Sequence, residues 1–172
     1  MRNSPEYVKW FLAGHSKYVL EEGAREVGPR LRPTGAFGPV PWQLKWAVLF
    51  RDGLYAQATE NYILTKFSGL GERKDFAFHY GQTPAIFDPD GFPIYRNAGL
   101  PAIIRIDNHR PYDPLSGGGP HLHYNGEDHI GQSRVSGLDI LNSDLFCFMH
   151  AVSEHRKTGR AFHEILNFTV QP

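Results

Sequence analysis

The middle of the chain is a series of short apolar segments separated by turn residues, which is typical of an antiparallel sheet. Asp52-Gly53 lies between two of these segments and is a strong hairpin signal. Residues 88–91, Asp-Pro-Asp-Gly, mark another turn. The strands that we expect are, in chain order, WQLKWAVLF (42–50), AQATENYILTKF (56–67), RKDFAFHYG (73–81), FPIYRNA (92–98) and PAIIRIDN (101–108).

Two of these strands separate apolar from chemically active side chains. Because successive side chains of a strand point to opposite faces, Phe78 and His79 lie on different sides of the sheet. In the last strand Ile104 and Ile106 alternate with Arg105 and Asp107 in the same way. The sequence therefore predicts a sheet with one buried face and one face that carries charge.

Helical patterns lie at the two ends of the chain. Residues 4–28 predict an amphipathic helix with Ser4 as its cap. A second helix is expected after residue 143, with an apolar stripe of Leu145, Phe148, Met149 and Val152 and a terminating Gly159. For residues 159–172 periodicity does not decide between a final strand and a short helix.

These elements predict an α+β fold, a mostly antiparallel β-sheet with an N-terminal helix and a C-terminal helix packed on it. We expect three parts: a helical extension over residues 1–28, a Pro/Gly-rich linker over 29–41 and one α+β domain over 42–172. At 172 residues the chain is long enough for a single core.

Composition and charge narrow the function classes. The 18 basic and 18 acidic residues cancel, so we expect no strong overall attraction to nucleic acid, although a local basic patch could bind phosphates. No apolar run is long enough to span a membrane, and no signal-peptide pattern begins the chain, so we expect a cytoplasmic protein with no membrane partner. The nine histidines favour acid/base or metal chemistry.

Most of the candidate chemistry lies in GGGPHLHYNGEDHIG, residues 117–131. In an extended backbone His121 and His123 lie on the same face, about 7 Å apart. If this segment pairs with PAIIRIDN, Arg105 and Asp107 line the same cleft. Paired imidazoles, a guanidinium and a carboxylate supply a general base, a general acid and a cation for a phosphate oxygen. Those groups can cleave RNA through attack of its own 2′-hydroxyl, without a metal.

We therefore predict His121, His123, Arg105 and Asp107 as catalytic residues. Four further residues lie in or next to the strands that are expected to form the cleft. The candidates for substrate binding are His79, Asn108, His109 and Tyr124.

Two alternatives stay open. His121, His123 and Glu127 have the HxHxxxE spacing of the first metal-binding motif of cupins, and His163 with Asn167 imitates the end of the second. Two imidazoles and a carboxylate suit a divalent transition metal such as zinc, iron or manganese. The other alternative is a protein-interaction module without catalysis, in which aromatic residues dock a partner: Trp42, Trp46, Tyr62 and Tyr80.

The order of these features resembles the TumE family of toxins from bacterial toxin-antitoxin modules over about residues 42–157. In that family an apolar strand that ends in Asp-Asn leads to HxH, a glycine and a helix. The matching residues here are IIRIDN (103–108), His121, His123, Gly126 and the helix that carries Leu145 to His155. ENYILTKF and RKDFAFHYG also resemble strands of that family's sheet.

The resemblance implies a toxin whose suspected activity is RNA cleavage and whose partner is a cognate antitoxin protein. Carried over position by position, the implied site residues are Arg105, Asp107, Asn108, His121 and His123. The chain departs from the family in a longer loop between Asn108 and His121 and in additions at both ends. A homodimer is left open.

Overall fold

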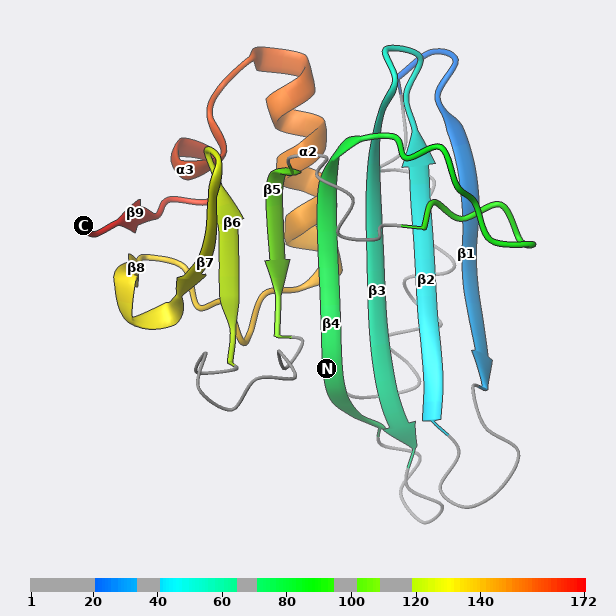
Figure 1. Cartoon of the computed structure of the whole chain (residues 1–172), viewed down its shortest axis with the longest axis horizontal. Helices are drawn as coiled ribbons and strands as arrows, with labels where there is room; N and C mark the ends of the chain where they lie inside the picture. The colour runs from blue at the N-terminus through cyan, green and yellow to red at the C-terminus, as the bar shows by residue number, and fades with distance from the viewer. Residues whose placement is uncertain (1–20, 34–40, 65–70, 95–101, 109–118) are drawn as a thin grey trace.

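The computed structural model describes residues 21–33, 41–64, 71–94, 102–108 and 119–172. Within them seven strands form one antiparallel sheet in which each strand pairs with the next along the chain (Figure 1). The strands are β1 (Arg25–Pro33), β2 (Pro41–Leu49), β3 (Leu54–Leu64), β4 (Gly71–Gln82), β5 (Ala102–Asp107), β6 (His121–Tyr124) and β7 (Glu127–Gly131). The expected hairpin at Asp52-Gly53 is confirmed as the connection between β2 and β3.

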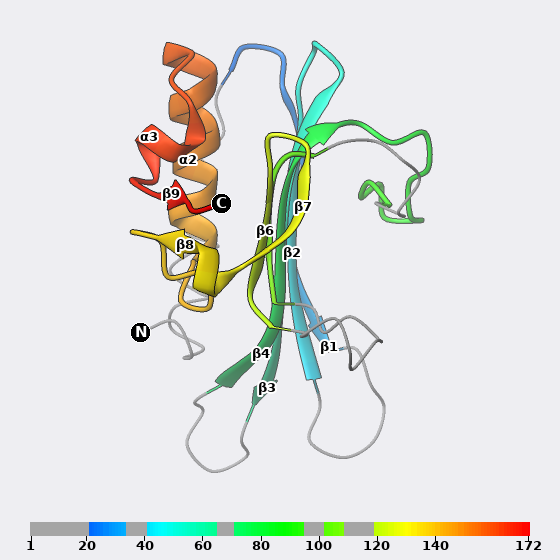
Figure 2. The same cartoon turned by 60° about the vertical axis from the view of Figure 1, so that its left-hand side comes forward.

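One face of the sheet is covered by helix α2 (Leu145–Thr158), which Figure 2 shows beside the sheet seen nearly edge on. Even-numbered positions of the central strands point to this helix and form the core, because side chains alternate between the faces. The predicted stripe of α2 is confirmed as buried. Core residues contributed by the strands include Leu44, Trp46, Ala58, Phe76, Phe78, Ile104, Ile106 and Leu122.

The ends of α2 follow from local chemistry. The side chain of Asp144 accepts a hydrogen bond from the Cys147 amide at 2.8 Å and caps the first turn. Gly159 ends the helix in the left-handed conformation, as expected. After it the chain forms both a short helix, α3 (Phe162–Ile165), and a short strand, β9 (Thr169–Val170), which pairs with β8 (Val135–Ser136). The 3-10 turn η2 (Gln132–Arg134) connects β7 to β8.

The expected α+β class with a helix at each end is wrong. Strands dominate the described residues, whose two α-helices, α2 and α3, both lie near the C-terminal end. Residues 25–33, assigned from sequence to the end of the N-terminal helix and the start of the linker, form β1 and pair with β2. The pairing shifts between Val27 and Arg30, so this edge strand accommodates Gly28 and Pro29 in an irregularity. The rest of the predicted helix, residues 1–20, and linker residues 34–40 lie outside the described residues.

The segment that follows β4 lies on the other face of the sheet, opposite α2 (Figure 2). The predicted turn at residues 88–91 is confirmed by a hydrogen bond from the Gly91 amide to the Asp88 carbonyl. Asp88 also accepts a hydrogen bond from Lys45 of β2 at 2.8 Å. Residues 92–94 of the expected strand 92–98 form only an isolated bridge, and residues 95–98 lie outside the described residues.

Among the described residues, no helix has the length and apolarity needed to cross a bilayer.

Candidate functional site

The site lies on the face of the sheet away from α2, where β4, β5 and β6 run side by side. Arg105 of β5 is flanked by His79 of β4 and His123 of β6 in the pairing register. One step along, Asp107 pairs with His121. The predicted pairing of HLHY with PAIIRIDN is thus confirmed, and it brings the four predicted catalytic side chains onto one face.

The hairpin between β6 and β7 determines which side chains of β7 lie on the same face as the two histidines. Asn125 and Gly126 form its turn with φ angles of 53° and 80°, and Tyr124 pairs directly with Glu127. An Asn-Gly pair with positive φ at both positions is the favoured two-residue hairpin turn. Since Glu127 faces the same side as Tyr124, the turn directs it away from the two histidines.

A bulge follows the turn. The register shifts between Leu122 and Tyr124, so that Leu122 pairs with Ile130 and two residues of β7, Asp128 and His129, lie opposite His123. Ile130 is thereby buried in the core. His129 adopts φ 57°, a left-handed conformation that is uncommon for residues other than glycine. The bulge brings a third imidazole to the site.

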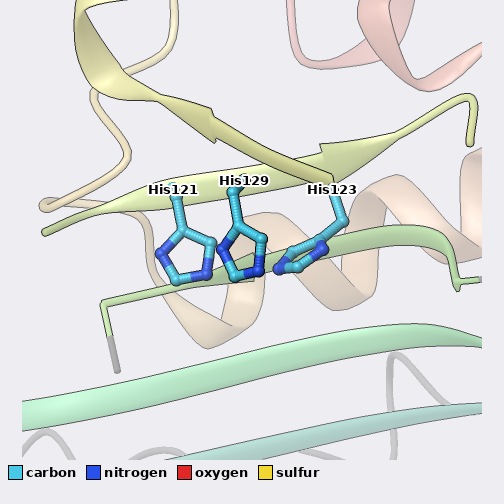
Figure 3. A group of neighbouring side chains, drawn as sticks. All are labelled: His121, His123 and His129. Carbon is cyan, nitrogen blue, oxygen red and sulfur yellow. The ribbon is translucent and has the colours of Figure 1, made fainter. Parts of the chain in front are cut away.

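The three imidazole rings form a nearly equilateral group. Ring centroids lie 5.0 Å apart for His121 and His123, 4.9 Å for His121 and His129, and 4.8 Å for His123 and His129. Figure 3 shows the three rings side by side, all pointing the same way from β6 and β7. His121 and His123 are buried, and His129 is exposed.

Asp107 and its neighbours form the buried end of the site. The Asp107 side chain is fully buried; its Oδ1 lies 2.9 Å from His121 Nε2 and its Oδ2 lies 2.5 Å from Arg105 Nε. Burial opposes ionisation of Asp107, but the hydrogen bond with His121 and the charge of Arg105 outweigh it and hold the pKa below its usual value. Asp107 is therefore an anion at neutral pH.

His121 and His123 have opposite electrostatic surroundings. Burial lowers the pKa of His121, but its hydrogen bonds to Asp107 and, at 2.9 Å, to the Gly119 carbonyl outweigh burial and raise it. For His123, burial lowers the pKa, and a hydrogen bond between Nδ1 and Asp128 Oδ1 at 2.8 Å only partly offsets this. His121 is thus the better proton donor of the pair and His123 the better acceptor.

The second nitrogen of His123 is available for chemistry. Its Nε2 is buried, has no hydrogen-bond partner among the described residues and lies 4.0 Å from Asp107 Oδ2. Because Asp128 accepts a hydrogen bond from Nδ1, Nε2 carries the lone pair of the neutral ring. About a tenth of each imidazole side chain, 10% for His121 and 11% for His123, remains exposed.

The four predicted substrate-binding residues differ in where the structure places them. His79 lies on the site face beside Arg105, stacked on Tyr55 at 4.9 Å between ring centroids. Burial, followed by the charge of Arg105, lowers the pKa of His79 to about 3, so this ring stays neutral and does not act as a cation. Asn108 binds backbone instead, accepting a hydrogen bond from the Phe76 amide at 2.7 Å. His109 lies outside the described residues.

Tyr124 and Glu127 do not join the site. Tyr124 faces the helix side of the sheet, where its hydroxyl lies 3.0 Å from His163 Nδ1. Glu127 forms an ion pair with Arg134. Of the cupin-like ligand set His121, His123 and Glu127, the structure does not bring Glu127 to the two histidines, because the Asn-Gly turn places that carboxylate on the other side of the hairpin.

The residues that could hold a metal are His121, His123 and His129. Their ligand atoms lie within 4.8 Å of one another. Nδ1 of His121 and of His123 contact a carbonyl and a carboxylate, the outer partners that orient metal-binding imidazoles. Sequence reasoning missed His129, and the Asn-Gly turn was the signal that could have excluded Glu127.

Comparison with known proteins gives one partial similarity. The chain is 30% identical over 105 residues to a protein of Aspergillus fumigatus described as a probable guanosine-diphosphatase. The match covers 59% of this chain but only 20% of that protein, so the chain spans about one fifth of the length of the relative it matches. No family model matches the chain, and no solved structure matches it.

Proposed function

We propose that the protein cleaves phosphodiester bonds of RNA with His121, His123, Arg105 and Asp107, and that no metal takes part. The observation that carries the proposal is the pair of buried imidazoles with opposite partners on one sheet face. His121 contacts the Asp107 carboxylate at 2.9 Å, whereas His123 keeps Nε2 without a hydrogen-bond partner among the described residues. Pairs of titratable groups with opposed environments are typical of general acid/base sites.

The reaction is a transfer within the RNA chain. Nε2 of His123 accepts the proton of the 2′-hydroxyl, whose oxygen forms a bond to phosphorus, and Asp128 stabilises the resulting imidazolium through Nδ1–H. The bond from phosphorus to the 5′-oxygen breaks, and His121 donates a proton to that oxygen. The products are a 2′,3′-cyclic phosphate and a 5′-hydroxyl.

Arg105 gives the site its preference for an anion. Its guanidinium contacts Asp107, Arg105 pairs with His123 in register, and the Arg105 side chain is only 17% exposed. A partly buried guanidinium favours a phosphate oxygen and opposes a second cation in the same space. This charge is the reason to prefer phosphodiester chemistry over a metal ion.

The wider biological role rests on the resemblance to the TumE family. In that role the protein is a cytoplasmic toxin that a cognate antitoxin protein neutralises. The described residues support the catalytic constellation of this proposal, and co-purification with the product of a neighbouring gene tests the partner.

The experiment is an RNA cleavage assay with the full chain in the presence of EDTA. His121→Ala and His123→Ala should each lower the rate by about a hundredfold or more while the protein stays folded. His150→Ala is the matched control, because His150 is an exposed histidine on α2. Equal cleavage by all three variants would refute the assigned roles. Guanosine diphosphate is included as a second substrate because of the name of the partial relative.

A second candidate function is a metal-dependent hydrolase that uses His121, His123 and His129. The observation in its favour is the convergence of three imidazoles whose ligand atoms lie within 4.8 Å of one another. Such a site would bind a divalent transition metal. Elemental analysis of untagged protein tests it: one equivalent of metal that is lost in His129→Ala, with activity abolished by EDTA, would replace our first proposal with this one.

A further inference from the structure

The proposed cleavage gives His129 no role, although the hairpin is distorted to bring this residue to the site. Its φ of 57° is a conformation that costs free energy for a side chain with Cβ. Such strain persists where the surrounding structure requires it and is concentrated at functional sites. The strained backbone at His129 therefore indicates that its imidazole has a function.

Packing does not explain the residue. His129 is exposed, whereas the next residue, Ile130, is buried and packs in the core. The ring lies 4.9 Å from His121 and 4.8 Å from His123, between centroids, at the solvent side of those two buried rings. A group that contacts both His121 and His123 therefore lies close to this ring.

We propose that His129 binds the phosphate group of the substrate. The assignment rests on the proposed function, and it adds a substrate-binding residue to the two imidazoles that move protons. A ring N–H of His129 donates a hydrogen bond to a non-bridging phosphate oxygen, while Arg105 faces the same cluster from β5. The ligand class is a phosphate mono- or diester, with inorganic phosphate as its smallest member.

The test measures inorganic phosphate binding to the full chain, in EDTA, from the shifts of histidine ring resonances. His129→Gly removes the imidazole and also the left-handed strain. It should bind phosphate about tenfold more weakly, since a hydrogen bond to a charged group is lost, and its thermal midpoint should equal or exceed that of the wild type. His129→Asn, which tolerates the same φ, should show the same loss.

Asn125→Gly is the matched control. Asn125 has a φ of 53° in the adjacent turn and is exposed, so this change alters the same kind of backbone position without removing an imidazole. It should leave phosphate binding unchanged.

Two results would overturn the inference: wild-type phosphate affinity in His129→Gly, or no phosphate-dependent shift of the His129 ring in the wild type. If phosphate binds as expected but RNA stays intact, the proposed function fails and the role of His129 in phosphate binding stands.

Discussion

The carboxylate of Asp107 and the imidazole of His121 face each other across the β5–β6 pair, with Oδ1 2.9 Å from Nε2. Asp107 also contacts Arg105, so one fully buried anion stabilises two groups that the proposed reaction needs as cations. Asp107→Asn keeps the shape but removes this charge. We expect the pKa of His121 to fall, cleavage to drop about a hundredfold, and the free energy of unfolding to decrease by about 2 kcal/mol.

Urea unfolding and the NMR titration of His121 measure these effects. Asp90→Asn is the control, because Asp90 is exposed and its ion pair with the half-buried Arg30 should contribute about 1 kcal/mol or less. An unchanged His121 titration in Asp107→Asn would contradict the electrostatic account of the site.

Asp128 orients His123 from the exposed side of the hairpin. Without its carboxylate, Nδ1–H of His123 loses its acceptor at 2.8 Å, and the pKa of His123 should fall further, because this hydrogen bond raises it. For Asp128→Ala we expect kcat to fall about tenfold with little change in KM. Glu127→Gln is the matched control: it alters the neighbouring carboxylate, which pairs with Arg134, and should leave cleavage unchanged. If Glu127→Gln loses activity instead, Glu127 takes part in the site, and the assignment of Asp128 as the orienting carboxylate is contradicted.

The Asn-Gly turn fixes the register that brings the bulge to His123. At Gly126 a Cβ would meet no atom within 4 Å, so the cost of Gly126→Ala is only that of the left-handed backbone at φ 80°, about 1 kcal/mol of unfolding free energy. Gly137→Ala should cost clearly more, because its Cβ would lie 2.2 Å from the Asn167 carbonyl oxygen. Urea unfolding of both variants checks the order, and the reverse order would contradict the described turn.

The pH dependence of stability tests the segment that lies over β2. Burial opposes ionisation of Asp88, but hydrogen bonds from Lys45 and from the Phe92 amide outweigh it and hold the pKa below its usual value. The stabilisation is therefore complete above the pKa of the unfolded carboxyl and is lost as pH falls through the lower, folded pKa. Between about pH 6 and pH 2 the wild type should lose about 1 kcal/mol more than Asp88→Asn. Parallel pH curves for the two proteins would show that Asp88 does not contribute in this way.

The two-residue period predicted the faces of the sheet because each strand keeps one apolar side. Ile104 and Ile106 are buried under α2, and Arg105 and Asp107 reach the opposite face, as the pattern indicates. β5 and β6 are adjacent because consecutive strands of an antiparallel sheet usually pair, even across a long connection such as residues 108–120. The four predicted catalytic residues could therefore be placed together from the sequence.

The pattern could not predict features that depend on irregular pairing. Regular alternation after the Asn-Gly turn would place His129 on the core side and Ile130 on the site side; burial of Ile130 requires the bulge, which moves His129 to the site. The segment from Arg25 to Pro33 reads as a helix end and linker, because pairing with β2, not local propensity, makes it a strand.

The end groups of cleaved RNA test the central claim most directly. Wild-type protein freed of metal with EDTA should leave a 2′,3′-cyclic phosphate on one fragment and a 5′-hydroxyl on the other, because the 2′-oxygen attacks and His121 protonates the leaving oxygen. Cleavage that stops in EDTA, or products with a 5′-phosphate and a 3′-hydroxyl, would show that a metal-activated water attacks instead and would contradict the account.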